Sequence, residues 1–187
     1  MDPNHLKKLL DDVRSGDVGV DAALDRLRHM PFEDLGFAKV DHHRALRQGM
    51  PEVIFGQGKT PEQITEIAGR LLERSPNMLA TRTEPKAAEM LCERFPQAEY
   101  FPASRVARVW GERAMTGKGK IVVACAGTSD IPVAEEAQLT AQTMGNEVEA
   151  IFDVGVAGLH RLMSARNGWR GRAFAWCARE WKALCRA

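Results

Sequence analysis

A strand–helix–strand unit within residues 121–161 constrains the fold of this chain more than any other segment. The apolar run Ile121–Ala126 is typical of a buried parallel strand. Pro132 and a stripe of small apolar residues at helical spacing predict a helix after it, which Gly145 ends. Glu147–Phe152 predicts a second strand. Because a helix joins them, the two strands are expected to lie parallel in an α/β fold.

The turn at residues 127–130, Gly-Thr-Ser-Asp, follows the first of these strands and opens the predicted helix. Open α/β sheets bind ligands at the carboxyl ends of their strands, and a helix N-terminus attracts phosphate. We expect Gly127, Thr128 and Ser129 to hold a phosphate, with Ser129 also capping the helix. Asp130 would accept a hydrogen bond from a ribose hydroxyl or hold Ser129 in place. The alternative is that Ser129 and Asp130 are only a helix cap.

A second group of polar residues follows the second predicted strand, where Asp153, His160 and Arg161 would line the other edge of the same cleft. A histidine can act as acid or base near neutral pH, so His160 is the candidate for that role. Arg161 could clamp a phosphate with two parallel hydrogen bonds. The alternative is that His160 and Arg161 only open a helix.

Residues 1–95 indicate a small α/β module, and residues 96–119, rich in Pro and Gly, indicate the connection to the strand–helix–strand unit, which extends over residues 120–163. Thr60 and Gln63 form a capping box with Pro61 at the first helical position. The expected elements of the module are helices over residues 6–13 and 20–27, strands over 37–40, 53–55 and 78–80, and helices beginning at Pro61 and Pro85.

A basic group in this module offers further candidates for the cleft. Two adjacent histidines at positions 42 and 43 cannot both face one side of a strand, so no metal site is expected there. The functional interpretation is positive charge for an anionic substrate, and the alternative is a solvated basic loop. The candidate cleft residues are Asp41, His42, Arg44, Arg47, Lys59 and Arg82.

The turn at residues 127–130 resembles, one residue shorter, the G-S-x-S-D loop of the PurE superfamily of aminoimidazole ribonucleotide carboxylases and mutases. That superfamily's second loop reads S-A-H-R, whereas residues 153–161 read DVGVAGLHR, which is similar to the LarB branch. The resemblance covers about residues 6 to 163. Other segments that resemble LarB proteins, and that purine-pathway carboxylases lack, are Asp41–Arg44, Arg47–Gly49, Pro51–Ile54, Gly58–Thr60 and Leu79–Arg82.

The resemblance implies a PurE-like, flavodoxin- or Rossmann-like parallel-sheet domain, incomplete in this chain, and a homo-oligomer. It implies an enzyme of nickel-pincer nucleotide cofactor biosynthesis, pyridinium-3,5-biscarboxylic acid mononucleotide synthase. Such an enzyme carboxylates the pyridinium ring of nicotinic acid adenine dinucleotide and hydrolyses its phosphoanhydride, which releases AMP. Carbon dioxide or bicarbonate is then a co-substrate; no cofactor is tightly bound, and Mg²⁺ could take part.

The resemblance also implies site residues. His160 would be the acid or base, and Asp153 would orient a ribose or assist proton transfer. LarB proteins use a cysteine thiolate that adds to the ring. That cysteine cannot be placed on any cysteine here, because Cys125 lies inside a strand and is expected to be a small buried hydrophobe.

The tail, residues 164–187, departs from this pattern. It holds three of the four tryptophans, with six basic residues and one acidic residue, and it does not alternate like a strand. Read one frame over, plausible codons for residues 178–187 give Ala-Gly-Met-Glu-Gly-Ala-Leu-Pro-Ser, a run that resembles the next LarB segment. We therefore expect the reading frame to be lost near Met163 or Ser164 and this chain to be inactive as written. The alternative is a native basic tail that binds nucleic acid or an anionic membrane.

Composition narrows the remaining classes. No apolar run approaches the roughly 20 residues that span a bilayer, and the polar N-terminus does not resemble a signal peptide. The four cysteines lack close metal-ligand spacing, which suits a reduced cytoplasm. We expect neither a membrane nor a nucleic-acid partner. Two alternatives to the LarB activity stay open: an aminoimidazole ribonucleotide carboxylase or mutase, and a non-catalytic binding module with a basic tail.

Overall fold

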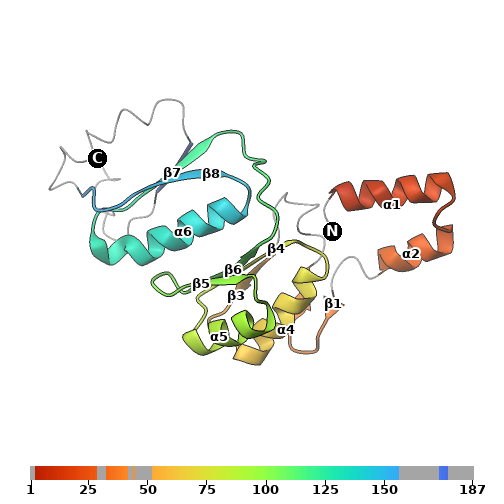
Figure 1. Cartoon of the computed structure of the whole chain (residues 1–187), viewed down its shortest axis with the longest axis horizontal. Coiled ribbons are helices and arrows are strands. Elements are labelled where there is room, and N and C mark those ends of the chain that lie inside the picture. The colour runs from red at the N-terminus through yellow and green to blue at the C-terminus, as the bar shows by residue number, and fades with distance from the viewer. Residues whose placement is uncertain (1–2, 29–32, 42–43, 45–51, 156–172, 177–187) are drawn as a thin grey trace.

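A computed structural model describes residues 3–28, 33–41, 44, 52–155 and 173–176 of the chain (Figure 1). Helices alternate with strands along most of this length, so the predicted α/β class is confirmed. The described strands form a two-stranded ribbon and two larger sheets. None of the described helices is long and apolar enough to span a bilayer.

The chain begins with a helical hairpin of α1 (Pro3–Ser15) and α2 (Val20–Arg28), as the two apolar stripes predicted. Leu9 and Ala23 are buried between the two helices. The ribbon of β1 (Glu33–Asp34) and β2 (Lys39–Val40) follows, and its second strand is shorter than the expected strand over residues 37–40.

Four strands form the first sheet, in the spatial order β3 (Val53–Phe55), β4 (Asn77–Thr81), β6 (Val106–Trp110) and β5 (Ala98–Phe101). The pair β3–β4 is parallel, and the other two pairs are antiparallel. Helix α4 (Pro61–Leu72) connects β3 to β4, and α5 (Pro85–Arg94) connects β4 to β5. Their buried side chains, such as Ile64 and Leu91, pack with Met78 of β4 in one core.

The capping box that begins α4 is confirmed. The Thr60 hydroxyl accepts a hydrogen bond from the Gln63 N–H at 3.3 Å, and the Gln63 side chain accepts one from the Thr60 N–H at 3.0 Å. These bonds satisfy two backbone donors that a helix end otherwise leaves free. The loop before the helix therefore has a fixed position at the end of β3.

The prediction of a plain connection over residues 96–119 needs correction. Strands β5 and β6 lie within this stretch and complete the first sheet, so only residues 111–119 lead from the first sheet to the second. The Pro and Gly residues hid these strands, because Pro102 lies in the turn between β5 and β6 and Gly111 lies directly after β6. Residues 106–109 of β6 are all buried, so apolar and polar residues do not alternate strictly along this strand.

The second sheet has the order β8 (Glu147–Ile151), β7 (Lys120–Ala124) and β9 (Ala173–Trp176), and both pairs are parallel. The predicted strands at residues 121–126 and 147–152 are therefore confirmed. The tail was expected to hold no strand, yet β9 pairs with β7 from Ile121↔Ala173 to Ala124↔Trp176. The expected change of reading frame near residue 163 lies outside the described residues and stays a prediction.

Helix α6 (Ile131–Thr143) lies between the two sheets (Figure 1). On one side Leu139 is buried against Leu79 and Val106 of the first sheet. On the other side Ala134 is buried against Val123 and Cys125 of the second. The small-residue stripe therefore faces the second sheet, whereas the polar face, which in an isolated unit would meet water, meets the first.

Arg108 supplies a polar anchor at the contact between α6 and the first sheet. Its side chain is only 9% exposed, and its Nε donates to Glu99 Oε2 at 2.9 Å. Its Nη1 donates to Gln142 Oε1 of α6 at 3.3 Å. The guanidinium also lies 4.9 Å and 4.5 Å from the ring centres of Phe101 and Trp110. A cation that is buried but paired and stacked in this way fixes the helix in register on the sheet.

Truncation of Leu139 tests whether α6 depends on the first sheet. Because Leu139 is 4% exposed, Leu139→Ala is expected to lower the free energy of unfolding by about 3 kcal/mol. The matched control is Leu10→Ala, since Leu10 on α1 is 56% exposed. Urea denaturation of both variants measures the difference, and equal losses would show that α6 does not pack on the first sheet as described.

Candidate functional site

The carboxyl ends of β7 and β8 meet, as the parallel pairing predicted. The Cys125 N–H donates to the Ile151 carbonyl at 3.1 Å, and the Val154 N–H donates to the Cys125 carbonyl at 3.0 Å. At Gly155 a Cβ would lie 2.9 Å from the Ala126 carbonyl oxygen, so only glycine fits there without a shift. The loops that follow the two strands are therefore in backbone contact.

The turn at residues 127–130 begins as predicted but caps its helix differently. Thr128–Asp130 forms a single 3₁₀ turn, and Asp130, not Ser129, is the N-cap of α6. Neither cap makes a side-chain hydrogen bond, so the predicted capping role of Ser129 is wrong. Thr128 and Ser129 are exposed at the mouth of the loop, where their hydroxyls can meet a ligand.

Asp130 lies beneath that mouth. The residue is 4% exposed. A charged carboxylate that is largely buried is stabilised by a hydrogen-bond donor. This position fits the expected acceptor for a hydroxyl group of a ligand.

Asp153 begins the opposite loop in a left-handed backbone conformation, with φ of 58°. A residue with a side chain adopts this conformation at a cost that is typical of functional sites and tight turns. Asp153 is half-buried and its neighbour Val154 is bonded to Cys125, so the loop holds it next to residues 125–127. His160 and Arg161, the other candidates of this edge, lie outside the described residues.

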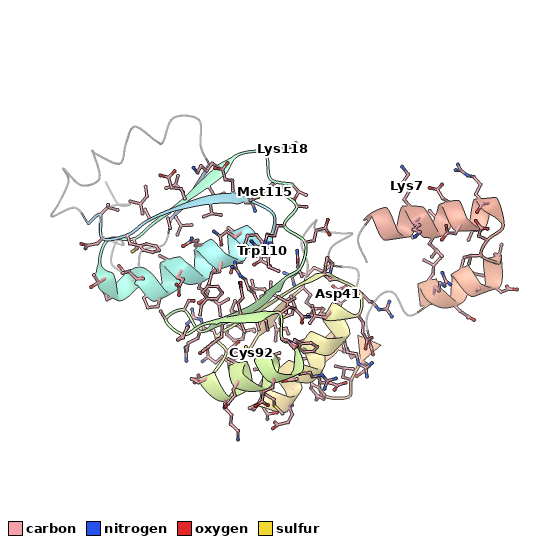
Figure 2. The ribbon with its side chains drawn as sticks, in the orientation of Figure 1. Lys7, Asp41, Cys92, Trp110, Met115 and Lys118 are labelled. Carbon is pink, nitrogen blue, oxygen red and sulfur yellow. The ribbon has the colours of Figure 1, made fainter. Side chains whose placement is uncertain are left out.

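The candidates of the first module lie in separate places. Gly56 donates to the Thr81 carbonyl at 2.7 Å, which joins the loop of Lys59 to the loop of Arg82 at the carboxyl ends of β3 and β4. The Lys59 amine donates a hydrogen bond to the Phe55 carbonyl at 2.8 Å. Asp41 lies on the opposite side of the first sheet from the amino end of α6 (Figure 2). Arg44 is exposed, and His42 and Arg47 lie outside the described residues.

Arg82 is the candidate that reaches the second unit. Its Nε lies 3.0 Å from Glu136 Oε2 of α6, an ion-pair distance without the alignment of a hydrogen bond. The backbone N–H of Ser104, also in the first module, donates to Glu135 Oε2 at 3.1 Å. Of the basic candidates, the structure therefore brings Arg82 to α6, and it shows no contact of Lys59 or Asp41 with the turn at residues 127–130.

A shallow cavity of about 520 Å³ runs along α6 beside this ion pair. Most of its wall is apolar, and it extends toward the carboxyl end of α6, away from the turn at residues 127–130. It therefore does not join the two candidate edges. Its lining residues are Arg82, Ile121, Val133, Glu136, Ala137, Thr140, Ala141, Met144 and Asn146.

Cys125 is 2% exposed and packs with Val123 and Ala134, which confirms the expectation of a small buried hydrophobe. Its Sγ lies 3.6 Å from the Gly127 carbonyl oxygen. Within the described part of the chain, no group of three His, Cys, Asp or Glu side chains could hold a metal ion.

The residues that sequence reasoning missed are Arg105, Glu135 and Glu136. Arg105, like Arg82, has a left-handed backbone, and an arginine in a sequence does not predict that conformation. The two glutamates belong to a helix face that the pattern assigned to solvent. The adjacent acidic pair on an otherwise small and apolar helix was the signal that could have indicated a partner surface.

Gly155→Ala tests the contact between the two loops. Its Cβ would meet the Ala126 carbonyl oxygen, so we expect a loss of about 1–3 kcal/mol in the free energy of unfolding. Gly119→Ala is the matched control, because a Cβ there has no atom within 4 Å. Thermal or urea unfolding of the two variants checks this, and an unchanged Gly155→Ala protein would contradict the contact.

Glu52 gives a pH-dependent prediction near Asp41. Its Oε2 accepts the Asp41 N–H at 2.6 Å; burial raises the pKa of Glu52, and this hydrogen bond partly opposes the rise. A raised pKa means that folding favours the protonated form, so ionised Glu52 lowers stability as pH rises from about 4.5 through the folded pKa.

Glu52→Gln is therefore expected to melt at a higher temperature than the wild-type chain at pH 7, with a difference that disappears toward pH 4. Glu66→Gln, on α4, is the control. Melting curves across this pH range measure the difference, and a stabilisation that grows at low pH would show the sign to be wrong.

Comparison with known proteins adds two findings. Residues 32–112 match the family described as the LarB/PurE-like N-terminal domain. The chain is also 32% identical over 170 residues to the uncharacterized protein MJ0165 of Methanocaldococcus jannaschii, a match that covers 86% of this chain and 66% of that protein. The first match ends at residue 112, so it covers the ribbon and the whole first sheet.

Proposed function

Because this chain belongs to the LarB/PurE-like family, we propose that its site serves the carboxylation of the pyridinium ring of nicotinic acid adenine dinucleotide, with hydrolysis of the phosphoanhydride and release of AMP. The chain spans about two thirds of its curated relative, so the activity of the whole protein is part of this proposal. The observation that carries it is Asp130, a buried carboxylate in the loop that follows the carboxyl end of a parallel strand.

The two loops divide the work of binding. The turn at residues 127–129 offers backbone N–H groups and two exposed hydroxyls to a phosphate at the start of α6. Asp130 accepts from a ribose hydroxyl. Asp153 orients the ribose or assists proton transfer from the adjoining loop. His160 as acid or base and Arg161 as phosphate clamp complete the proposed site.

The remaining parts of the proposal follow from the resemblance. Carbon dioxide or bicarbonate supplies the carboxyl group, with no tightly bound cofactor, and the reaction belongs to nickel-pincer nucleotide biosynthesis. The thiolate that would add to the ring is not assigned to Cys125, because that side chain is buried in the core of the second unit. A homo-oligomer in the cytoplasm is the proposed setting.

Mass spectrometry tests the function directly. The full chain is incubated with nicotinic acid adenine dinucleotide and ¹³C-bicarbonate, and AMP and a labelled carboxylated mononucleotide are measured. Calorimetric titration of the dinucleotide measures binding separately. A chain that binds the dinucleotide without turnover would still support the proposed substrate. Turnover of aminoimidazole ribonucleotide, or no binding of the dinucleotide, would overturn the proposal.

Ser129→Ala and Asp130→Ala test the assigned residues. Each removes a hydrogen-bond partner of the proposed ligand, and a bond to a charged group is worth about 1.5–3 kcal/mol, so Kd for the dinucleotide is expected to rise about tenfold or more. Asp11→Asn on the surface of α1 is the control. A melting curve verifies that each variant is folded, and unchanged affinity in folded variants would remove these residues from the site.

A further inference from the structure

Two arginines at one end of the central strands β4 and β6 of the first sheet have an unusual backbone. Arg82, directly after β4, has φ of 54°, and Arg105, directly before β6, has φ of 53°. Residues with side chains rarely adopt the left-handed region, and arginine is not among the types that favour it. Backbone strain of this kind concentrates at ligand clamps and active sites.

The two arginines are neighbours. The antiparallel register of β4 and β6 ends with Ala80 paired to Ala107, and each arginine lies two residues beyond this pair on its own chain segment. The Thr83 N–H donates to the Arg105 carbonyl at 2.8 Å, which confirms that the strands are still adjacent here.

Each arginine has one carboxylate neighbour. Arg82 Nε lies 3.0 Å from Glu136 Oε2, and Arg105 Nη1 donates to Glu84 Oε1 at 2.8 Å. A guanidinium has five N–H donors, so one carboxylate leaves several for a second acceptor. The side chains are 37% and 43% exposed, and a ligand can therefore reach both.

Unsatisfied polar atoms gather at the same place. Among the described residues, the buried side-chain atoms without a hydrogen-bond partner are Arg82 Nε and Thr83 Oγ1, in consecutive residues. Buried polar groups in native proteins normally have a partner, and Arg82 Nε has Glu136 at ion-pair distance, so it is Thr83 Oγ1 that indicates a missing water, ion or ligand. These two atoms lie where the strained arginines meet.

The two arginines also lie on the same side of the molecule as the proposed substrate loop (Figure 1). Both arginines lie at the carboxyl end of β4, and the turn between β5 and β6 lies on the same side of the molecule as the amino end of α6 (Figure 1). Asp130 and Glu136 are six positions apart on α6, which at 1.5 Å per residue is about 9 Å. A dinucleotide is long enough to contact both.

We propose that Arg82 and Arg105 form a second anion subsite, which binds a phosphate group of the nucleotide substrate through paired guanidiniums. The substrate's identity rests on the proposed function; the arginine subsite rests on the geometry above. The first module is then part of the substrate site, and its sheet edge extends the phosphate-binding turn of the second unit across α6.

Arg82→Asn and Arg105→Asn test the subsite, because asparagine removes the charge but tolerates the left-handed backbone. Titrations with AMP and with inorganic phosphate, at low salt on the full chain, are expected to show a Kd at least tenfold higher for the double variant. Arg70→Gln on α4 is the control, since Arg70 is ion-paired and 37% exposed, like Arg82. Melting curves confirm that the fold is retained.

The outcomes are distinguishable. Loss of affinity in the arginine variants but not in Arg70→Gln supports the subsite, and a loss for AMP with none for phosphate identifies a nucleotide as its ligand. An equal loss of affinity in the Arg82, Arg105 and Arg70 variants would reflect net charge and would overturn the subsite. If the arginine variants bind as the wild-type chain does while Asp130→Ala does not, the subsite is wrong and the proposed function stands. If the wild-type chain binds neither probe, the subsite is wrong, and the ¹³C-bicarbonate assay decides the function separately.

Discussion

The packing of helix α6 between two sheets is the contact on which the rest of the structure depends. Leu139 and Ala134, on different faces of one helix, belong to the cores of the first and second sheets. Helix α6 covers Leu79 and Val106 of the first sheet with one face, and it covers Val123 of the second sheet with the other. Each candidate edge therefore owes its position to the same 13-residue segment.

Much of the fold could be predicted from local patterns. The capping box at Thr60, the proline at the start of α5 and the apolar run of β7 each indicate one kind of element whatever surrounds them. The strands β5 and β6 could not be read this way, because β6 also pairs with the more distant β4 and a proline lies in the turn between β5 and β6. Strand β9 was not predicted either, because its four residues form a strand through pairing with the distant β7.

The site was predictable to a lesser degree. The rule that parallel strands bring their carboxyl ends together was enough to join residues 125–127 with residues 153–155, and the backbone hydrogen bonds agree. The rule was not enough for the capping of α6, where a 3₁₀ turn moves the cap from Ser129 to Asp130. Nor could a sequence reveal that Arg82 and Arg105 are neighbours, since that depends on the antiparallel pairing of β4 with β6.

The helical hairpin at the start of the chain has a consequence for how cooperative the molecule is. Among the described residues, the apolar cluster of α1 and α2 draws on these two helices and their turn alone, and its buried members are Leu9 and Ala23. A unit with so small a core opens and closes on its own at low free energy. The chain thus behaves as two cooperative units of unequal strength, a large one centred on α6 and a small one that can be exchanged, extended or clipped without loss of the first.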